Sequence, residues 1–172
     1  GGDVDLATYF AMARGTQGAA DKGHDGCAHA IDATAQEMTK WFDTNYHYLV
    51  PELAAGQRFA LSSTRILDQF AEAKALGYQT RPVLLGPVTF LSLAKGEGVD
   101  PLDLLDALLP VYEDVIWKLV ELGADWVQID EPALVLDLSD ARRDAFRRAY
   151  ARLATKGAKL MLTSYFGGLG DN

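Results

Sequence analysis

The chain has 172 residues, of which 49% are hydrophobic and 23% charged, a composition typical of a globular protein with a substantial core. Its formal net charge of −8 argues against binding to nucleic acid or to an anionic membrane, since both attract basic surfaces. No apolar run approaches the roughly 18 residues of a membrane span, no signal peptide opens the chain, and one cysteine cannot form an internal disulfide, so we expect a cytoplasmic protein.

A first helix is expected over residues 5–14, where apolar residues recur at helical spacing and Gly15 supplies a stop. The glycine-rich stretch that follows contains three residue types that can bind zinc, His24, Cys27 and His29. A structural zinc site takes four ligands, commonly in paired spacings. A loop that happens to contain two histidines is therefore the preferred interpretation, with zinc binding as the alternative.

The segment after this loop looks like the centre of the chain's organisation. We expect a short helix over residues 31–38 and then a buried strand from Thr39, where aromatic residues favour β-structure. The run 43–47 is polar, and Pro51 closes the segment because proline lacks an amide donor. A strand that turns polar at its carboxyl end is how a parallel α/β fold presents a site. The alternative is a strand that runs out into an ordinary solvated loop.

Apolar residues at alternating steps of three and four predict three longer helices farther along the chain. Their expected limits are, in order, Ser62 or Ser63 to Gly77, Asp100 to Gly123, and Ser139 or Asp140 to Gly157. Pro110 should kink or divide the second of them. A shorter helix is expected over residues 88–93.

Continuous apolar runs predict three further buried strands, at residues 81–87, 125–129 and 159–165. With the strand near residue 39, about four strands alternate with helices, which implies parallel pairing through right-handed crossovers. An eight-stranded barrel takes about 250 residues, so this chain is too short to close one. It is either a small open sheet or a piece of something larger.

Three of the predicted strands end in residues that could form a site. Lys40 lies at the first, Gly86 at the second, and Asp130 and Glu131 at the third. These ends share one edge of a parallel sheet, so one cleft could present a cation, tight backbone turns and two carboxylates. Neighbouring strand residues point to opposite faces, so the two acids should not form an acid/base pair. One could bind a ligand amine or hydroxyl while the other cross-links the edge.

Each of these candidates also has a plain structural interpretation. Asp130 and Glu131 could be a hydrogen-bonding pair that only holds the edge together, and Lys40 could be an ordinary solvated lysine. The sequence contains no defensible Ser/His/Asp arrangement, no GxGxxG motif and no GxxxxGK phosphate loop. Cys27 has no evident activating base, so we do not expect it to be a nucleophile.

Three long segments resemble the amino-terminal domain of the cobalamin-independent methionine synthase family, the 5-methyltetrahydropteroyltriglutamate–homocysteine methyltransferases. They are MTKWFDTNYHY at 38–48, RPVLLGPVTF at 81–90 and DWVQIDEPAL at 125–134. The resemblance runs over essentially all of the chain. It implies that residues 1–172 are a fragment of the amino-terminal barrel: an α/β fold, a partial (β/α)8 TIM barrel with about four parallel strands. It also implies that the zinc-bearing carboxy-terminal barrel is absent.

The resemblance further implies a function for the parent enzyme, the transfer of a methyl group from 5-methyltetrahydrofolate polyglutamate to homocysteine. In the family, a zinc held by His, Cys, Glu and Cys of the second barrel binds the homocysteine sulfur. None of those ligands has a counterpart here, so the resemblance gives this piece no catalytic residue and no metal ligand. The family's lysine that binds the anionic folate tail matches Lys40, which is the one binding residue expected.

Two alternatives remain at this point. The chain could be a standalone half-barrel module that binds a ligand, or part of a related uroporphyrinogen decarboxylase-like or corrinoid-dependent methyltransferase barrel. The length of the parent reading frame discriminates the module from the enzyme. In either case we expect small-molecule partners, and open strand edges that favour self-association of the piece.

Overall fold

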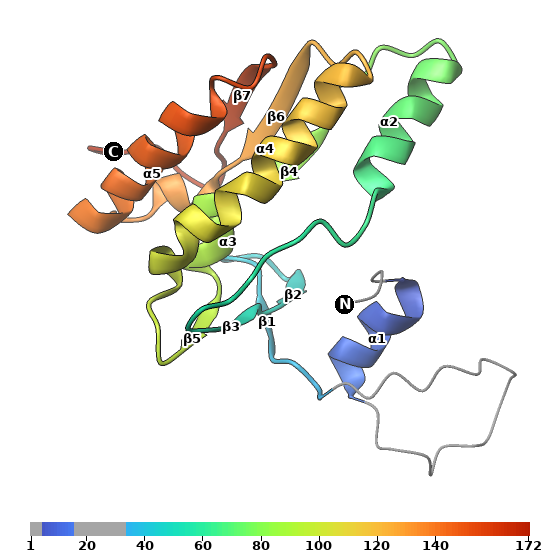
Figure 1. The fold of residues 1–172 in the computed structure, drawn as a ribbon. Coiled ribbons are helices and arrows are strands. Elements are labelled where there is room, and N and C mark those ends of the chain that lie inside the picture. Colours follow the sequence, from blue (N-terminus) through green and yellow to red (C-terminus); the bar gives the residue numbers. More distant parts are fainter. Residues whose placement is uncertain (1–4, 16–33) are drawn as a thin grey trace, which may run out of the picture. The chain divides into compact units, whose positions relative to one another are not determined.

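The computed structural model describes residues 5–15 and 34–172 of the chain (Figure 1). The chain divides into two compact units, residues 1–52 and 53–172, and each is described by itself. Among the described residues, no helix combines the length and the apolar character that crossing a membrane requires.

The first unit opens with helix α1, Leu6–Arg14, which confirms the helix predicted there. The carboxylate of Asp5 accepts a hydrogen bond from the backbone N–H of Thr8 at 2.7 Å, so a side chain satisfies one of the free amides of the first turn. Gly15 ends the helix with a φ of 73°, a conformation that favours glycine.

Among the described residues of the first unit, a β-hairpin follows this helix. Strand β1, Met38–Lys40, pairs antiparallel with strand β2, His47–Leu49. The backbone N–H of Trp41 donates to the carbonyl of Tyr46 at 2.7 Å, which closes the turn, and the amide of Thr44 donates to Trp41 at 3.1 Å.

The prediction of one long parallel strand from Thr39 is therefore wrong. The chain reverses over residues 41–46, because the polar run contains Asp, Thr and Asn, which favour turns through hydrogen bonds to their own backbone. The helix predicted over 31–38 is also wrong in its described part, since residues 34–37 lie in neither helix nor strand.

The second unit is built on a parallel sheet. Its three strands, in spatial order, are β4 (Val83–Leu85), β6 (Trp126–Asp130) and β7 (Lys159–Thr163). Both neighbouring pairs are parallel, as predicted for these three segments. Two shorter strands, β3 (Glu52–Ala54) and β5 (Lys95–Glu97), pair with each other in a separate small sheet. The fold is thus mixed α/β with a parallel sheet.

Four α-helices and two short 3-10 helices connect these strands. They are α2 (Arg65–Ala75), α3 (Pro87–Ser92), η2 (Pro101–Leu104), α4 (Leu105–Glu121), η3 (Pro132–Val135) and α5 (Asp140–Leu153). The predicted starts at Asp100 and Ser139 are confirmed, since both side chains accept a backbone N–H. The N-cap of α2 is Thr64, one or two residues beyond the predicted serines. Pro110 does not divide α4, which continues through it as one helix.

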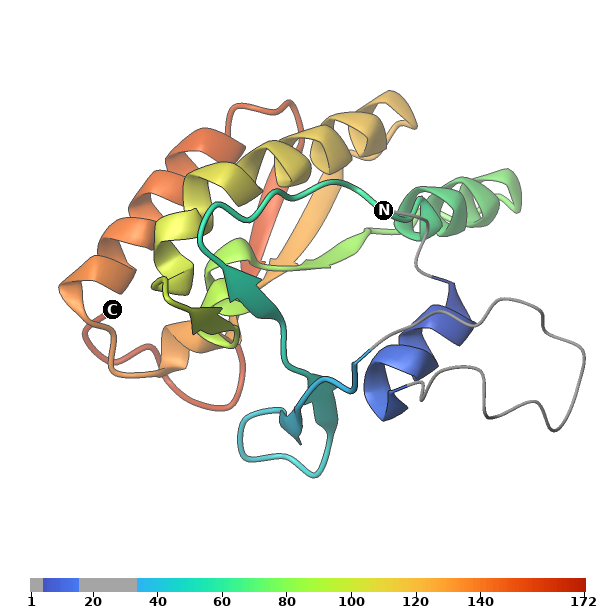
Figure 2. The same ribbon diagram turned by 60° about the horizontal axis from the view of Figure 1, so that its bottom comes forward.

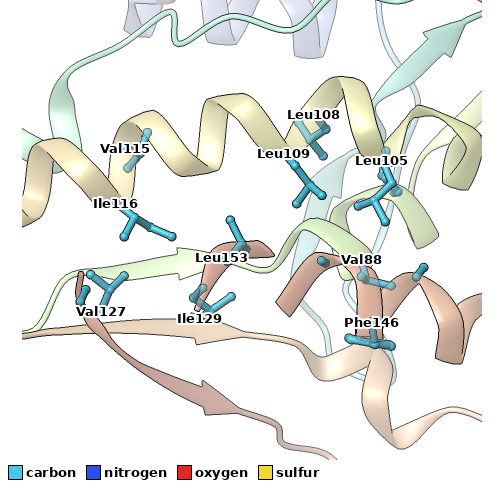
Figure 3. Close-up of a cluster of buried hydrophobic side chains, with 14 of the residues drawn as sticks. Val88, Leu105, Leu108, Leu109, Val115, Ile116, Val127, Ile129, Phe146 and Leu153 are labelled. Carbon is cyan, nitrogen blue, oxygen red and sulfur yellow. The ribbon is translucent and has the colours of Figure 1, made fainter. Parts of the chain in front are cut away.

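The core lies between α4, α5 and one face of the parallel sheet. Figures 1 and 2 show α4 and α5 side by side over the same face. Side chains of α4 point toward Val127 and Ile129 of β6 (Figure 3), and both strand residues are fully buried. The predicted inner stripe of α4 is confirmed by the buried residues Leu105, Leu109, Ile116 and Leu119. Burial of this stripe is what holds the helix against the sheet.

The opposite face of this sheet has no helix over it within residues 53–172, and we call it the uncovered face. Side chains along a strand alternate between faces, and the strand register assigns the following residues to it: Val83, Leu85, Trp126, Gln128, Asp130, Lys159, Met161 and Thr163. Val83 and Trp126 are 47% and 42% exposed.

An ion cluster joins the outer sides of α4 and α5. The guanidinium of Arg152 donates to both carboxylate oxygens of Glu113, at 2.7 and 2.9 Å, and the ammonium of Lys156 lies 3.1 Å from the same carboxylate. The hydrogen bond from Arg152 is the main cause that lowers the pKa of Glu113 to about 2.

This cluster predicts an acid-dependent contribution to stability. The folded-state pKa of Glu113 lies below its ordinary value of 4.5, so the stabilisation is present above that value and is lost as the pH falls toward about 2. Because these side chains are partly exposed, we expect Glu113→Gln to cost only about 1 kcal/mol at pH 7, and nothing near pH 2, in urea unfolding. Asp114→Asn, which breaks only an exposed pair with Lys118, should change stability by about half as much or less. A pH-independent effect of Glu113→Gln would contradict this assignment.

Candidate functional site

The carboxyl ends of β4, β6 and β7 lie along one edge of the parallel sheet, which we call the carboxyl edge. Glu131 follows β6 at this edge, and its side chain is fully buried. Its Oε1 accepts from the backbone N–H of Val88 at 3.2 Å and from the hydroxyl of Tyr150 at 2.7 Å. Its Oε2 accepts from the backbone N–H of Thr89 at 2.7 Å. One carboxylate therefore connects β6 to the first turn of α3 and to α5.

The surroundings of this carboxylate are hydroxyls and amides. Burial raises the pKa of Glu131, while the hydrogen bonds from the Thr89 and Tyr150 side chains and from the amides of α3 oppose that rise. Burial also raises the pKa of Tyr150 and of Tyr112, and the charge of Glu131 adds to both shifts. The Tyr112 hydroxyl donates to the carbonyl of Leu85 at 2.8 Å, so both tyrosines act as neutral donors at the carboxyl edge.

Asp130 lies on the other face of the same strand. Its carboxylate is partly exposed on the uncovered face, where the Nε2 of Gln128 donates to it at 2.7 Å. The Oε1 of Gln128 in turn accepts two hydrogen bonds from the guanidinium of Arg81, at 3.1 and 2.8 Å. The structure therefore separates Asp130 and Glu131, as the strand alternation predicted. Glu131 cross-links the edge, and Asp130 is the acid that a ligand could reach.

Lys40, the binding residue expected from the sequence, lies in the first unit. It is the last residue of β1, it is exposed, and its Cα partner in the hairpin is His47. Within the described residues its ammonium forms no ion pair, so it is free to offset the charge of an anion. The aromatic rings of Trp41 and Tyr48, 5.5 Å apart in an edge-to-face arrangement, hold the hairpin beside it.

The possible zinc ligands His24, Cys27 and His29 lie outside the described residues. In the part of the chain that the structure describes, no group of three or more His, Cys, Asp or Glu side chains could hold a metal ion.

A cavity of about 520 Å³ lies at the opposite, amino end of the parallel sheet. Lys74, Tyr78, Arg81, Asp125 and Trp126 are among the residues that line it. The Lys74 ammonium donates to the carbonyl of Leu122 at 2.7 Å, so this cation is engaged in holding the end of α4. This cavity could not be predicted from sequence patterns, because its lining comes from three separate segments.

Sequence reasoning also missed the partners of Glu131. Thr89 and Tyr150 are far from Glu131 in the chain, and Tyr150 occupies an apolar stripe of α5, as Tyr112 does in α4, where a ring is expected for packing. Tyr112 and Tyr150 could have been suspected only from the fact that a buried hydroxyl needs a partner.

Comparison with known proteins adds a second line of evidence. Residues 1–172 match the family model described as "Cobalamin-independent synthase, N-terminal domain". The chain is 64% identical over 180 residues to a protein of Nitrobacter winogradskyi named 5-methyltetrahydropteroyltriglutamate–homocysteine methyltransferase, and 65% identical over 181 residues to a protein of the same name from Caulobacter vibrioides. These alignments cover 99% and 100% of this chain but only 23% of each relative.

Proposed function

Because the chain belongs to the family of N-terminal domains of cobalamin-independent synthases, we propose that it is the folate-binding part of a 5-methyltetrahydropteroyltriglutamate–homocysteine methyltransferase. The parent protein moves a methyl group from the folate to homocysteine, and this piece alone is not catalytic. The observation that carries the proposal is the 64% identity over 99% of the chain to a protein of that name. The cytoplasmic location expected from the single cysteine is part of the same proposal.

The proposed fold of the parent region is the amino-terminal (β/α)8 TIM barrel of the family, of which residues 1–172 form an internal part. Two features support it. The three strands β4, β6 and β7 are parallel and connected through helices on one face, and the opposite face is left uncovered within residues 53–172, as the inner side of a cut barrel would be. When the piece is isolated, its outer strands offer unpaired backbone groups, so we propose that it self-associates through them.

We assign the binding of the folate tail to Lys40. The tail carries several carboxylates, and an exposed lysine with no competing ion pair in the described residues offsets that charge. The hairpin turn and the ring contact of Trp41 with Tyr48 fix the end of β1 from which this side chain projects.

The zinc that the family resemblance implies does not fit the described residues, since they contain no suitable group of ligands. We therefore derive no step through a metal in this chain. The metal and the homocysteine that it would bind belong, in this proposal, to parts of the parent protein outside residues 1–172.

Reversing the charge of Lys40 tests the assignment. In the full-length enzyme we expect Lys40→Glu to weaken binding of the triglutamate folate by about tenfold or more, because an attraction becomes a repulsion. Binding of homocysteine should change far less. The measurement is a titration with triglutamate folate, followed by tryptophan fluorescence, beside a separate titration with homocysteine.

Two further variants control for the charge change itself. Lys40→Arg keeps the cation and should retain most of the affinity. Lys159→Glu makes the same charge reversal at the amino end of β7, the end opposite to the carboxyl edge, and should leave folate binding unchanged. Equal losses for folate and homocysteine in Lys40→Glu would contradict the role of Lys40. The family assignment would still stand in that case, because it rests on the sequence match.

A further inference from the structure

Helix α3 begins without a capping side chain of its own. Its N-cap residue is Gly86, which has no side chain, and Pro87 follows at the first helical position. The backbone N–H groups of Val88 and Thr89 therefore have no local acceptor. Because both residues are fully buried, water cannot serve instead.

The acceptor comes from a residue more than 40 positions away in the chain. Glu131 accepts a hydrogen bond from each of these amides, at 3.2 and 2.7 Å. From its place directly after β6 it does what a Ser or Asp side chain usually does at the N-cap. The Tyr150 hydroxyl, at 2.7 Å, adds a third donor and holds the carboxylate from the side of α5.

Gly86 is required for this arrangement. A Cβ built on Gly86 would lie 2.0 Å from the Cδ of Glu131 and 2.2 Å from its Oε1. The carboxylate therefore occupies the space that any side chain at position 86 would need. The absence of a side chain at Gly86 thus removes the local cap of α3 and also leaves the space in which Glu131 can cap the helix instead.

The hydrogen-bond donors around Glu131 suit an ionised carboxylate better than a neutral amide of the same size, and they oppose the rise in pKa that burial causes. Within the described residues Glu131 forms no salt bridge, and every hydrogen bond to its two oxygens is donated by its neighbours. An ionised carboxylate can accept all of them. A glutamine amide offers one acceptor oxygen, and its NH2 group would face a backbone N–H of α3.

We propose that Glu131 is a remote helix cap that works through its charge, and that it is the positioning residue for the turn 86–89 at the carboxyl edge. The same side chain fixes the backbone next to Asp130, which points to the uncovered face. Glu131 therefore holds both the turn 86–89 and the backbone of Asp130 in place. Loss of the charge frees the first turn of α3 while the sheet beneath it stays intact.

Hydrogen exchange at single amides tests this inference. In Glu131→Gln, we expect the amides of Val88 and Thr89 to exchange about tenfold to a hundredfold faster relative to the amides of β6, because a buried donor has lost its acceptor. Glu113→Gln, the same chemical change at the surface ion cluster, should leave this ratio unchanged. Tyr150→Phe should also leave it unchanged, since both amides keep their acceptor.

Two results would overturn the inference. One is that Val88 and Thr89 accelerate no more than the amides of β6 in Glu131→Gln. The other comes from the wild-type protein, which needs no variant to fold. There, the amide resonances of Val88 and Thr89 should shift at the same pH midpoint as the carboxyl carbon of Glu131. Amide resonances that ignore that titration would show that the charge does not position the turn.

Discussion

Alanine in place of Gly86 should destabilise the protein by about 2–5 kcal/mol, a large part of the stability of an ordinary domain. The backbone of Gly86 does not resist the change, because its φ of −72° and ψ of 146° suit any residue. The cost comes from the new Cβ, which would lie 2.0 Å from the Cδ of Glu131. The carboxylate must move, and the amides of Val88 and Thr89 then lose their hydrogen-bond acceptor. Urea unfolding gives the free energy directly.

A matched glycine and a double-mutant cycle separate this cause from others. Gly168→Ala adds the same methyl group where no atom lies within 4 Å, and it should change stability by less than about 0.5 kcal/mol. In a Glu131→Ala background, Gly86→Ala should cost less than about 1 kcal/mol, because the obstructing side chain is gone. If the two substitutions are simply additive, the contact between residues 86 and 131 is not the source of the effect.

Truncation of Leu119 to alanine should cost about 2–5 kcal/mol through the loss of buried surface and the cavity left behind. Leu119 is fully buried on the inner stripe of α4, where that helix packs against the parallel sheet. The decrease should appear as a lower midpoint of urea unfolding with an unchanged slope.

Leu122, three residues farther on, provides the comparison. It has the same side chain but is 37% exposed at the C-terminal end of α4. Its replacement by alanine should cost less than about 1 kcal/mol, because less apolar surface leaves water there. A similar loss of unfolding free energy for both substitutions would mean that packing of the inner stripe of α4 is not what stabilises the core.

The sequence predicted the second unit well because its signals are local and repeated. Leu105, Leu109 and Ile116 recur at helical spacing along 17 residues, and continuous apolar runs in β6 and β7 predict buried parallel strands. The separation of Asp130 from Glu131 followed from strand alternation alone. Such patterns need no knowledge of distant contacts.

The failures have the opposite origin. The segment around Thr39 carries the same β-favouring residues whether it continues or reverses, and hydrogen bonds across residues 41–46 decide the matter. Likewise, the sequence could show that Glu131 is an acid after a strand but not that Gly86 leaves room for it. That room exists only once β4 and β6 lie side by side.

The chain of hydrogen bonds from Arg81 through Gln128 to Asp130 gives the uncovered face a polarity. The side-chain amide of Gln128 can satisfy both neighbours in only one orientation, with its oxygen toward the guanidinium and its nitrogen toward the carboxylate. In this chain of hydrogen bonds the positive charge of Arg81 lies near the start of the strands and the negative charge of Asp130 at their carboxyl end. A dipolar molecule or peptide laid along this surface has one favourable direction, with its acidic end over Arg81 and its basic end over Asp130.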